Sequence, residues 1–237
     1  KDYELTTLEE FLNSYANFSY DYKNEELPSA YCMRDEYMIY TEHQSSTGLC
    51  WAFSSGEALA TTIMKATGEY LDFSEAWMTT ALTYGVKNSL LPDYKLLTTD
   101  PYIPNSGGWF YGYDLASRKF GLMLDQDFAF ENTFEISYEN VDQFYNLYSD
   151  KSSLSFLDNI QSGIFTNYVG QSNSTLIKNS MKNHILQHGA ISACMRFTDL
   201  STTTYNNTTI HYKTPSVDTT DGPFLKLIGW DDKLTVN

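Results

Sequence analysis

Apolar and small residues recur at helical spacing in the stretch that follows Cys50. Their positions lie three or four residues apart, and they are Ala52, Gly56, Leu59, Ala60, Ile63 and Thr67. Gly68 comes next, and glycine is the residue that most often ends a helix in the left-handed conformation. The pattern therefore predicts a helix that begins at Cys50 and ends before Gly68.

Hydroxyl residues suited to capping mark the starts of the other predicted helices. Thr7 opens a capping box and a short amphipathic helix within an N-terminal extension, residues 1–26. Further helices are predicted to start at Ser74, Ser137 and Ser174, and another one closes on Gly121. Strand patterns come later, over residues 189–194, 210–213 and 224–230. Helices first and strands later favour an α+β fold.

Length and charge narrow the class of protein. At 237 residues the chain is long enough for a well-buried core, in one large domain or two fused halves. Fifteen Lys and Arg against 30 Asp and Glu give a net charge of −15, which makes nucleic acid and anionic membranes poor partners. No stretch approaches the ~18 consecutive apolar residues of a membrane span.

Cys50 is the candidate for chemistry because of its place at a predicted helix start. Free N–H groups and the helix dipole favour an anion there, and the thiolate is the nucleophilic form of cysteine. The other two cysteines, Cys32 and Cys194, are expected to be lone buried thiols, with a bridge between them as the alternative. A thiol alone does not hydrolyse an amide efficiently, because an imidazole must also pair with it and protonate the leaving amine.

The run Gln44-x5-Cys50-Trp51-Ala52-Phe53-Ser54 resembles the active-site segment of papain-like cysteine peptidases. Their local signature is Cys-Gly-(Ser/Ala)-Cys-(Trp/Tyr), and here Thr47 and Leu49 replace its first cysteine and its small residue. Three further stretches resemble the family in the same order, namely 71–75, 105–110 and 189–194. The resemblance implies a two-lobed α+β fold over residues 27–237, with a helical left lobe, an antiparallel β-barrel-like right lobe and an insertion near 137–172.

The resemblance also implies a set of site residues. Cys50 stands at the nucleophile and Gln44 at the side-chain donor of the oxyanion hole. In the family, extended substrate backbone lies against a glycine pair, which corresponds to Gly107 and Gly108. Residues that line the main specificity pocket correspond to Phe110 and Cys194, both apolar, so a hydrophobic substrate residue is expected there.

The expected catalytic histidine is missing from its aligned position. The family places it six residues before the glycine of the strand that here contains Gly229, and that position is Pro223. His211 and His43 are the candidates for a substitute base. His184 and His188 form an i, i+4 pair without a third metal-ligand pattern, so we expect them on a solvated helix face and expect no metal site. The family's orienting Asn would follow on a strand beyond Asn237, so we expect the last strands to be truncated.

Two hypotheses follow from these residues. The first is a weakly active or inactive pseudo-peptidase that binds peptide or protein. The alternative is an active cysteine endopeptidase that uses Cys50 with a non-standard histidine. Neither function requires a cofactor, and the family resemblance implies a secreted or lysosome-like compartment. Nothing in the sequence indicates the oligomeric state.

Overall fold

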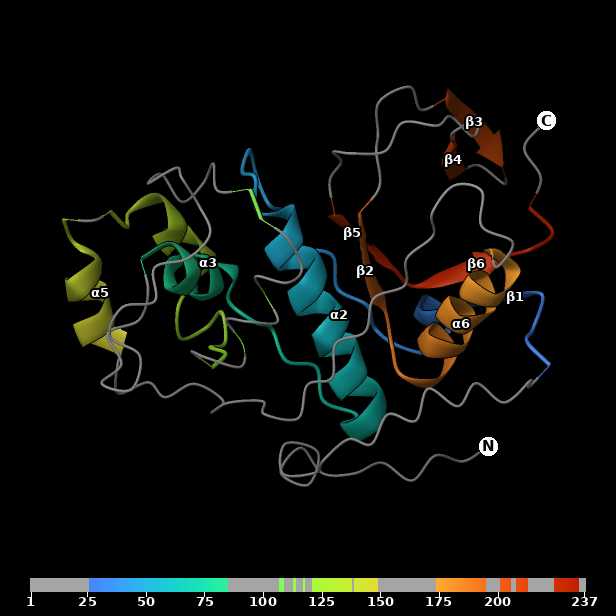
Figure 1. Cartoon of the computed structure of the whole chain (residues 1–237), viewed down its shortest axis with the longest axis horizontal. Helices are drawn as coiled ribbons and strands as arrows, with labels where there is room; N and C mark the ends of the chain where they lie inside the picture. The colour runs from blue at the N-terminus through green and yellow to red at the C-terminus, as the bar shows by residue number, and fades with distance from the viewer. Residues whose placement is uncertain are drawn as a thin grey trace.

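A computed structural model describes residues 26–84, 107–108, 113, 117, 121–137, 139–148, 174–194, 201–205, 208–212 and 224–234 (Figure 1). The predicted helix behind Thr7 lies outside the described residues, as do Phe110, Pro223 and residues 149–172 of the predicted insertion. The boundaries of the N-terminal extension and of the insertion therefore stay predictions.

Helix α2 (Cys50–Thr67) confirms the helix predicted from the apolar spacing. Gly68 follows it with a φ of 81°, and its N–H donates to the carbonyl oxygen of Met64 at 2.8 Å. Trp51, Ala52, Ala60 and Ile63 are almost completely buried, because α2 lies between α3 and α5 on one side and α6 with the strands on the other (Figure 1). It is the central element of the fold.

Two α-helices and a 3₁₀ helix make up the helical part of the fold beside α2. Helix α3 (Glu75–Tyr84) starts where predicted, since Ser74 Oγ accepts a hydrogen bond from the N–H of Trp77 at 2.9 Å. The 3₁₀ helix η3 (Phe130–Phe134) and helix α5 (Val141–Tyr148) follow, and α5 begins four residues after Ser137, which is therefore not its cap as predicted. Trp77, Phe128 and the residues around them form the core of this part.

The strands pair two by two, and every pair is antiparallel. Strand β1 (Ala30–Cys32) pairs with β6 (Gly229–Asp231), β2 (Ile191–Cys194) with β5 (Phe224–Leu227), and β3 (Ser201–Tyr205) with β4 (Thr208–Tyr212). A short 3₁₀ helix, η1 (Met33–Asp35), follows β1. The described residues contain these three two-stranded sheets and no closed barrel.

The stretch 224–230, predicted as one strand, is two. Its first half pairs with β2 and its second half with β1, and the backbone changes partner at Ile228, whose carbonyl oxygen accepts from the N–H of Met33 at 2.9 Å. Gly229 allows this close approach, because a Cβ there would stand 2.1 Å from the carbonyl oxygen of Tyr31. The break depends on a strand almost 200 residues earlier.

Helix α6 (Ser174–Gln187) leads into β2 and packs near the carboxyl end of α2. Lys65 Nζ donates to the carbonyl oxygen of Leu186 at 2.7 Å, and the N–H of Ala190 donates to Thr61 Oγ1 at 2.8 Å. Gly189 turns between them with a φ of 131°. The α+β class is thus confirmed, with α3 and α5 to one side of α2 and the strands with α6 to the other (Figure 1).

Two predictions about polar side chains are wrong. His184 and His188 are not on a solvated face: both are partly buried, and their ring centroids are 5.2 Å apart. Neither Cys32 nor Cys194 forms a disulfide, as expected, but Cys194, the last residue of β2, is exposed and not buried.

Candidate active site

The loop that leads into Cys50 is closed by its own side chains. Gln44 Nε2 donates to the carbonyl oxygen of Thr47 at 2.8 Å, and Thr47 Oγ1 donates to the carbonyl oxygen of Gln44 at 2.7 Å. Ser45 takes a positive φ of 53° inside this turn. Leu49 is fully buried and anchors the end of the loop. The Gln44 amide is therefore held beside the helix start, with one of its two N–H groups used in the loop.

Cys50 is the first residue of α2. As such, its backbone N–H has no intrahelical acceptor. The side chain is partly buried against a core cluster that includes Trp51 and Phe224. A thiol at this place has the helix dipole behind it.

Gly108 lies against the residue next to the thiol. A Cβ built on Gly108 would stand 2.4 Å from Cε2 of Trp51, whereas a Cβ on Gly107 would meet no atom within 4 Å. The structure thus brings the glycine pair to the helix start that carries Cys50, with one glycine packed and the other facing open space. Phe110 lies outside the described residues.

Strands β2 and β5 reach α2 within its first turns. Ser54 Oγ donates to the carbonyl oxygen of Leu225 at 3.0 Å and also contacts Ser192 Oγ. In the β2–β5 register Cys194 stands opposite Phe224, and Phe224 packs in the same cluster as Trp51. The residue that directly precedes Phe224 is Pro223, at the position aligned with the family's histidine.

The described histidines lie in three different places. His43 is exposed in the loop before Cys50, and its Nδ1 accepts from the N–H of Ser45 at 3.0 Å, so that nitrogen is directed back into its own loop. His211 stands on β4, opposite Thr202, in a hairpin that Figure 1 draws apart from the amino end of α2. His184 lies on α6 and His188 directly after its end, and the carbonyl oxygens of Ile185 and Leu186 on the same helix accept from Lys65. Lys65 is 15 residues after Cys50, so about 22 Å separate the two along the helix axis, which excludes this pair as the base.

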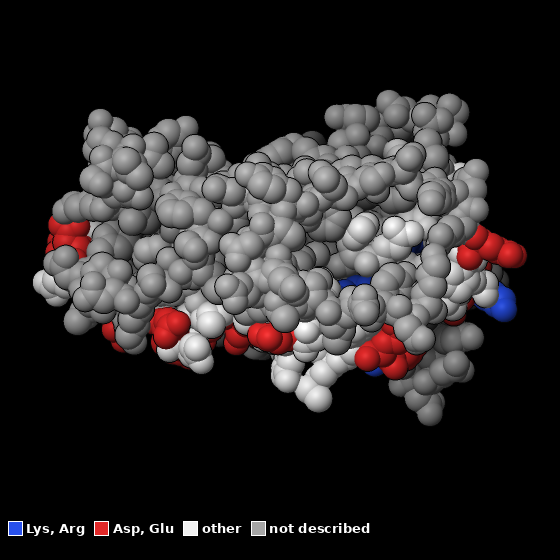
Figure 2. Space-filling view, turned by 90° about the horizontal axis from the view of Figure 1, so that it is seen from below, with Lys and Arg blue, Asp and Glu red and all other residues white. Residues whose placement is uncertain are grey.

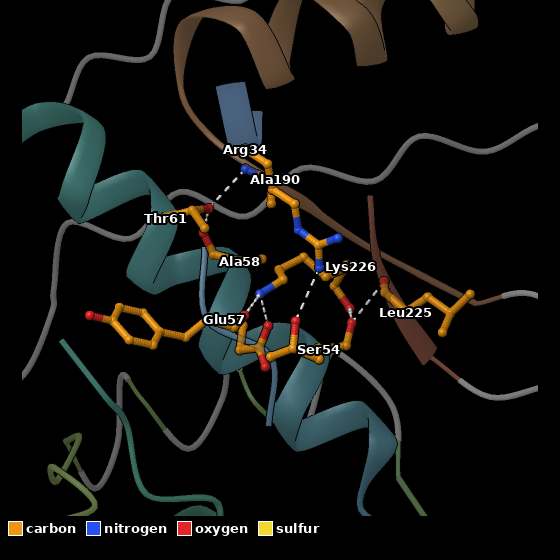
Figure 3. A network of polar contacts seen from close by, with 11 residues as sticks. Arg34, Ser54, Glu57, Ala58, Thr61, Ala190, Leu225 and Lys226 are labelled. Carbon is orange, nitrogen blue, oxygen red and sulfur yellow. Dashed lines mark hydrogen bonds and ion pairs between the residues drawn. The ribbon is translucent and has the colours of Figure 1, made fainter. Parts of the chain in front are cut away.

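Several ionisable side chains in this part of the fold are buried or partly buried, and Glu42 lies in the loop before Cys50. Burial, then a hydrogen bond with Asp72, raises the pKa of Glu42 to about 7. Burial, then the charge of Glu42, raises the pKa of Glu75 well above its ordinary value. Lys226 on β5 forms an ion pair with Glu57 on α2 (Figure 3).

The burial and pairing of these charged residues were not predicted from the sequence. The only available signal was a single charge inside an otherwise apolar stretch, as for Lys226 between Leu225 and Leu227. The described residues contain no group of three or more His, Cys, Asp or Glu that could hold a metal ion. In the same part of the chain, no helix has the length and apolar character needed to cross a bilayer.

An α+β chain whose central helix begins with a cysteine, and whose preceding loop presents a glutamine, has the plan of a thiol hydrolase. The family model for papain family cysteine proteases matches residues 27–237, and the chain belongs to this family.

Solved structures that resemble the chain are cysteine proteases. One is the Carica candamarcensis protease CMS1MS2 in complex with E-64, at 21% identity and a TM-score of 0.31, with 44% of this chain and 41% of that chain covered. Another is Amb a 11, a major ragweed pollen allergen, in its proform, at 16% identity and a TM-score of 0.41, with 78% and 46% covered. The chain thus spans less than half the length of each. No curated protein matches the chain by sequence.

Proposed function

We propose that this papain-family chain binds an extended peptide or protein segment at Cys50 and hydrolyses it weakly or not at all. The observation that carries the proposal is Pro223, which precedes the strand whose Phe224 packs with Trp51 beside Cys50. A proline side chain has no base. Without an imidazole at that point the thiol is not deprotonated by a partner, and the leaving amine receives no proton.

Binding is supported by the parts of the site that remain. Gly107 leaves open space where a substrate backbone would lie, and the Gln44 amide and the Cys50 N–H are donors for a carbonyl oxygen. Cys194 is exposed at the end of β2, in accordance with a place beside a bound side chain. Phe110 and Cys194 together favour a hydrophobic ligand residue, and Phe110→Ala should weaken binding of such a peptide.

The net charge of −15 adds a preference for basic partners. Acidic side chains are spread along the lower edge of the surface in Figure 2, where few basic ones are visible among the described residues. Long-range attraction would raise the association rate for a basic peptide at low salt.

The alternative function is an active cysteine endopeptidase that takes its base from His43 or His211. The placement of His43 next to Gln44 favours it, because the Nε2 atom of that ring is not used in the Ser45 hydrogen bond. In this case a thiolate–imidazolium pair would form with Cys50.

The pH dependence of Cys50 alkylation distinguishes the pseudo-peptidase from the active endopeptidase. Iodoacetamide labelling is located by peptide mass spectrometry, with Cys50→Ser as the negative control and exposed Cys194 as an internal reference thiol. For a pseudo-peptidase, Cys50 should be labelled at pH 5 no faster than Cys194, because no imidazole activates its thiol. Rapid labelling at pH 5 would contradict the proposal, and loss of that reactivity in His43→Gln or His211→Gln would identify the base.

A further inference from the structure

Lys226 joins strand β5 to helix α2 and to the loop that precedes Cys50. It stands on β5, two residues after Phe224, and its ammonium group pairs with Glu57, two turns after Cys50 on α2. The same Nζ donates to the carbonyl oxygen of Tyr40 at 3.0 Å, four residues before Gln44. Figure 3 shows this ammonium group between the helix and the strand.

The ion pair is largely withdrawn from water. The side chains of Lys226 and Glu57 are each only 11% exposed. Burial lowers the pKa of Lys226 to about 8, the charge of Glu42 opposes this, and the charge of Arg34 adds to it. A charge in such a place must be paired, because an uncompensated buried charge is strongly destabilising.

Ser54 already provides a separate attachment of β5 to α2. Its hydroxyl bonds to the carbonyl oxygen of Leu225, one residue before Lys226. Strand β5 therefore has a contact with the helix that does not involve the ion pair. What Lys226 adds is the hydrogen bond to Tyr40, which joins the Gln44 loop to both elements.

We propose that Lys226 is a positioning residue of the Cys50 site: its ammonium group holds the loop that carries Gln44 against α2 and β5. The proposal deepens the proposed function, because the loop supplies one of the two donors for a bound carbonyl oxygen. Glu57 keeps the ammonium group in place, and Tyr40 is the point at which the loop is held. Arg34 Nη2, which donates to Thr41 Oγ1 at 3.1 Å, supports the same loop from its exposed side.

The test separates the loop contact from the ion pair. Lys226→Met removes both, and the double variant Lys226→Met/Glu57→Met also removes the unpaired carboxylate. Replacement of both members of a buried ion pair by apolar residues is often neutral for stability. The double variant should therefore regain the melting temperature lost in Lys226→Met but not the loop contact.

Two measurements on the peptide-free protein report how firmly the loop of residues 41–49 is held. Hydrogen exchange of the amides in residues 41–49 should become at least about tenfold faster in the double variant, as expected for loss of a hydrogen bond from a charged donor. The rate of Cys50 alkylation at a single pH should change in parallel. Exchange and alkylation equal to those of the wild type would overturn the proposal and leave Lys226 as a structural ion pair only.

Two further variants complete the design. Glu57→Gln leaves the ammonium group without its carboxylate, so the melting temperature should fall, but the bond to Tyr40 is kept, so the exchange of residues 41–49 should rise less than in the double variant. Exchange as fast as in the double variant would assign the effect to the ion pair. Lys182→Met breaks the ion pair between Lys182 on α6 and Asp232 and should leave the loop unchanged. Because no peptide is used, failure to bind peptide would refute the proposed function and leave this result standing.

Discussion

The indole ring of Trp51 fills the space in which any side chain on Gly108 would have to stand. A Cβ on Gly108 would lie 2.4, 2.6 and 2.7 Å from three ring atoms, which is closer than real Cβ contacts. Trp51 is 1% exposed, so its ring is enclosed by other atoms of the core. The segment that holds Gly107 and Gly108 can therefore pack against Trp51, the residue next to Cys50, only because Gly108 has no side chain.

Gly108→Ala should destabilise the protein. The added methyl group overpacks a buried site, which typically costs about 1–3 kcal/mol. Urea unfolding measures the loss. Gly107→Ala is the matched control, since its Cβ meets no atom within 4 Å, and its stability should stay within about 0.5 kcal/mol of the wild type. Equal losses in the two variants would contradict the packing.

Ser54→Ala should weaken the contact between α2 and the β2–β5 pair. Ser54 is 5% exposed, and its loss leaves the carbonyl oxygen of Leu225 without this donor, at a cost of about 1–3 kcal/mol. Ser55→Ala is the control, because Ser55 makes only a 3.5 Å contact to Ser192. A double-mutant cycle of Ser54→Ala with Ser192→Ala should show non-additive losses; simple additivity would mean that the two hydroxyl groups do not interact.

Glu42 should make the fold less stable as pH rises through the weakly acidic range. Its pKa is raised from 4.5 to about 7, first by burial and then by the hydrogen bond with Asp72. Between these values the folded state holds a proton that the unfolded chain has released, so stability falls as pH increases. In Glu42→Gln the melting temperature should fall less between pH 5 and pH 7 than in the wild type. Glu69→Gln, at an exposed position, should keep the wild-type slope.

Local signals were sufficient for much of the fold. The bounds of α2 and the cap at Ser74 depend on residues within a few positions of each other, and the structure has both where the sequence predicts them. The division of 224–230 was not predictable, because it depends on which distant strand pairs with each half. A short strand such as β1 carries no pattern of its own.

The candidate site likewise has features that the local sequence predicts and features that depend on how distant elements pack. The sequence predicts a cysteine at a helix start, and the helix begins there. It does not predict that Glu57 and Lys226 meet, since each reads as an isolated surface charge until α2 and β5 are placed side by side. The burial of His184 and His188 likewise follows from the packing of α6 against the carboxyl end of α2, which no local spacing reveals.

His184 should have the opposite effect on the pH profile to that of Glu42. Burial, then the charge of His188, lowers the pKa of His184 from 6.5 to about 4. As pH falls from 6.5 towards 4, the unfolded chain takes up a proton that the folded state does not bind, so stability is lost. His184→Gln should therefore lose less stability than the wild type between pH 6.5 and pH 4.5.

The two variants should tilt the curve of melting temperature against pH in opposite directions, because the windows of Glu42 and His184 overlap while their signs differ. Glu42→Gln should make stability rise more steeply with pH, and His184→Gln should make it rise less steeply or fall. A tilt in the same direction for both variants would mean that at least one of the two groups is in the other protonation state in the folded protein.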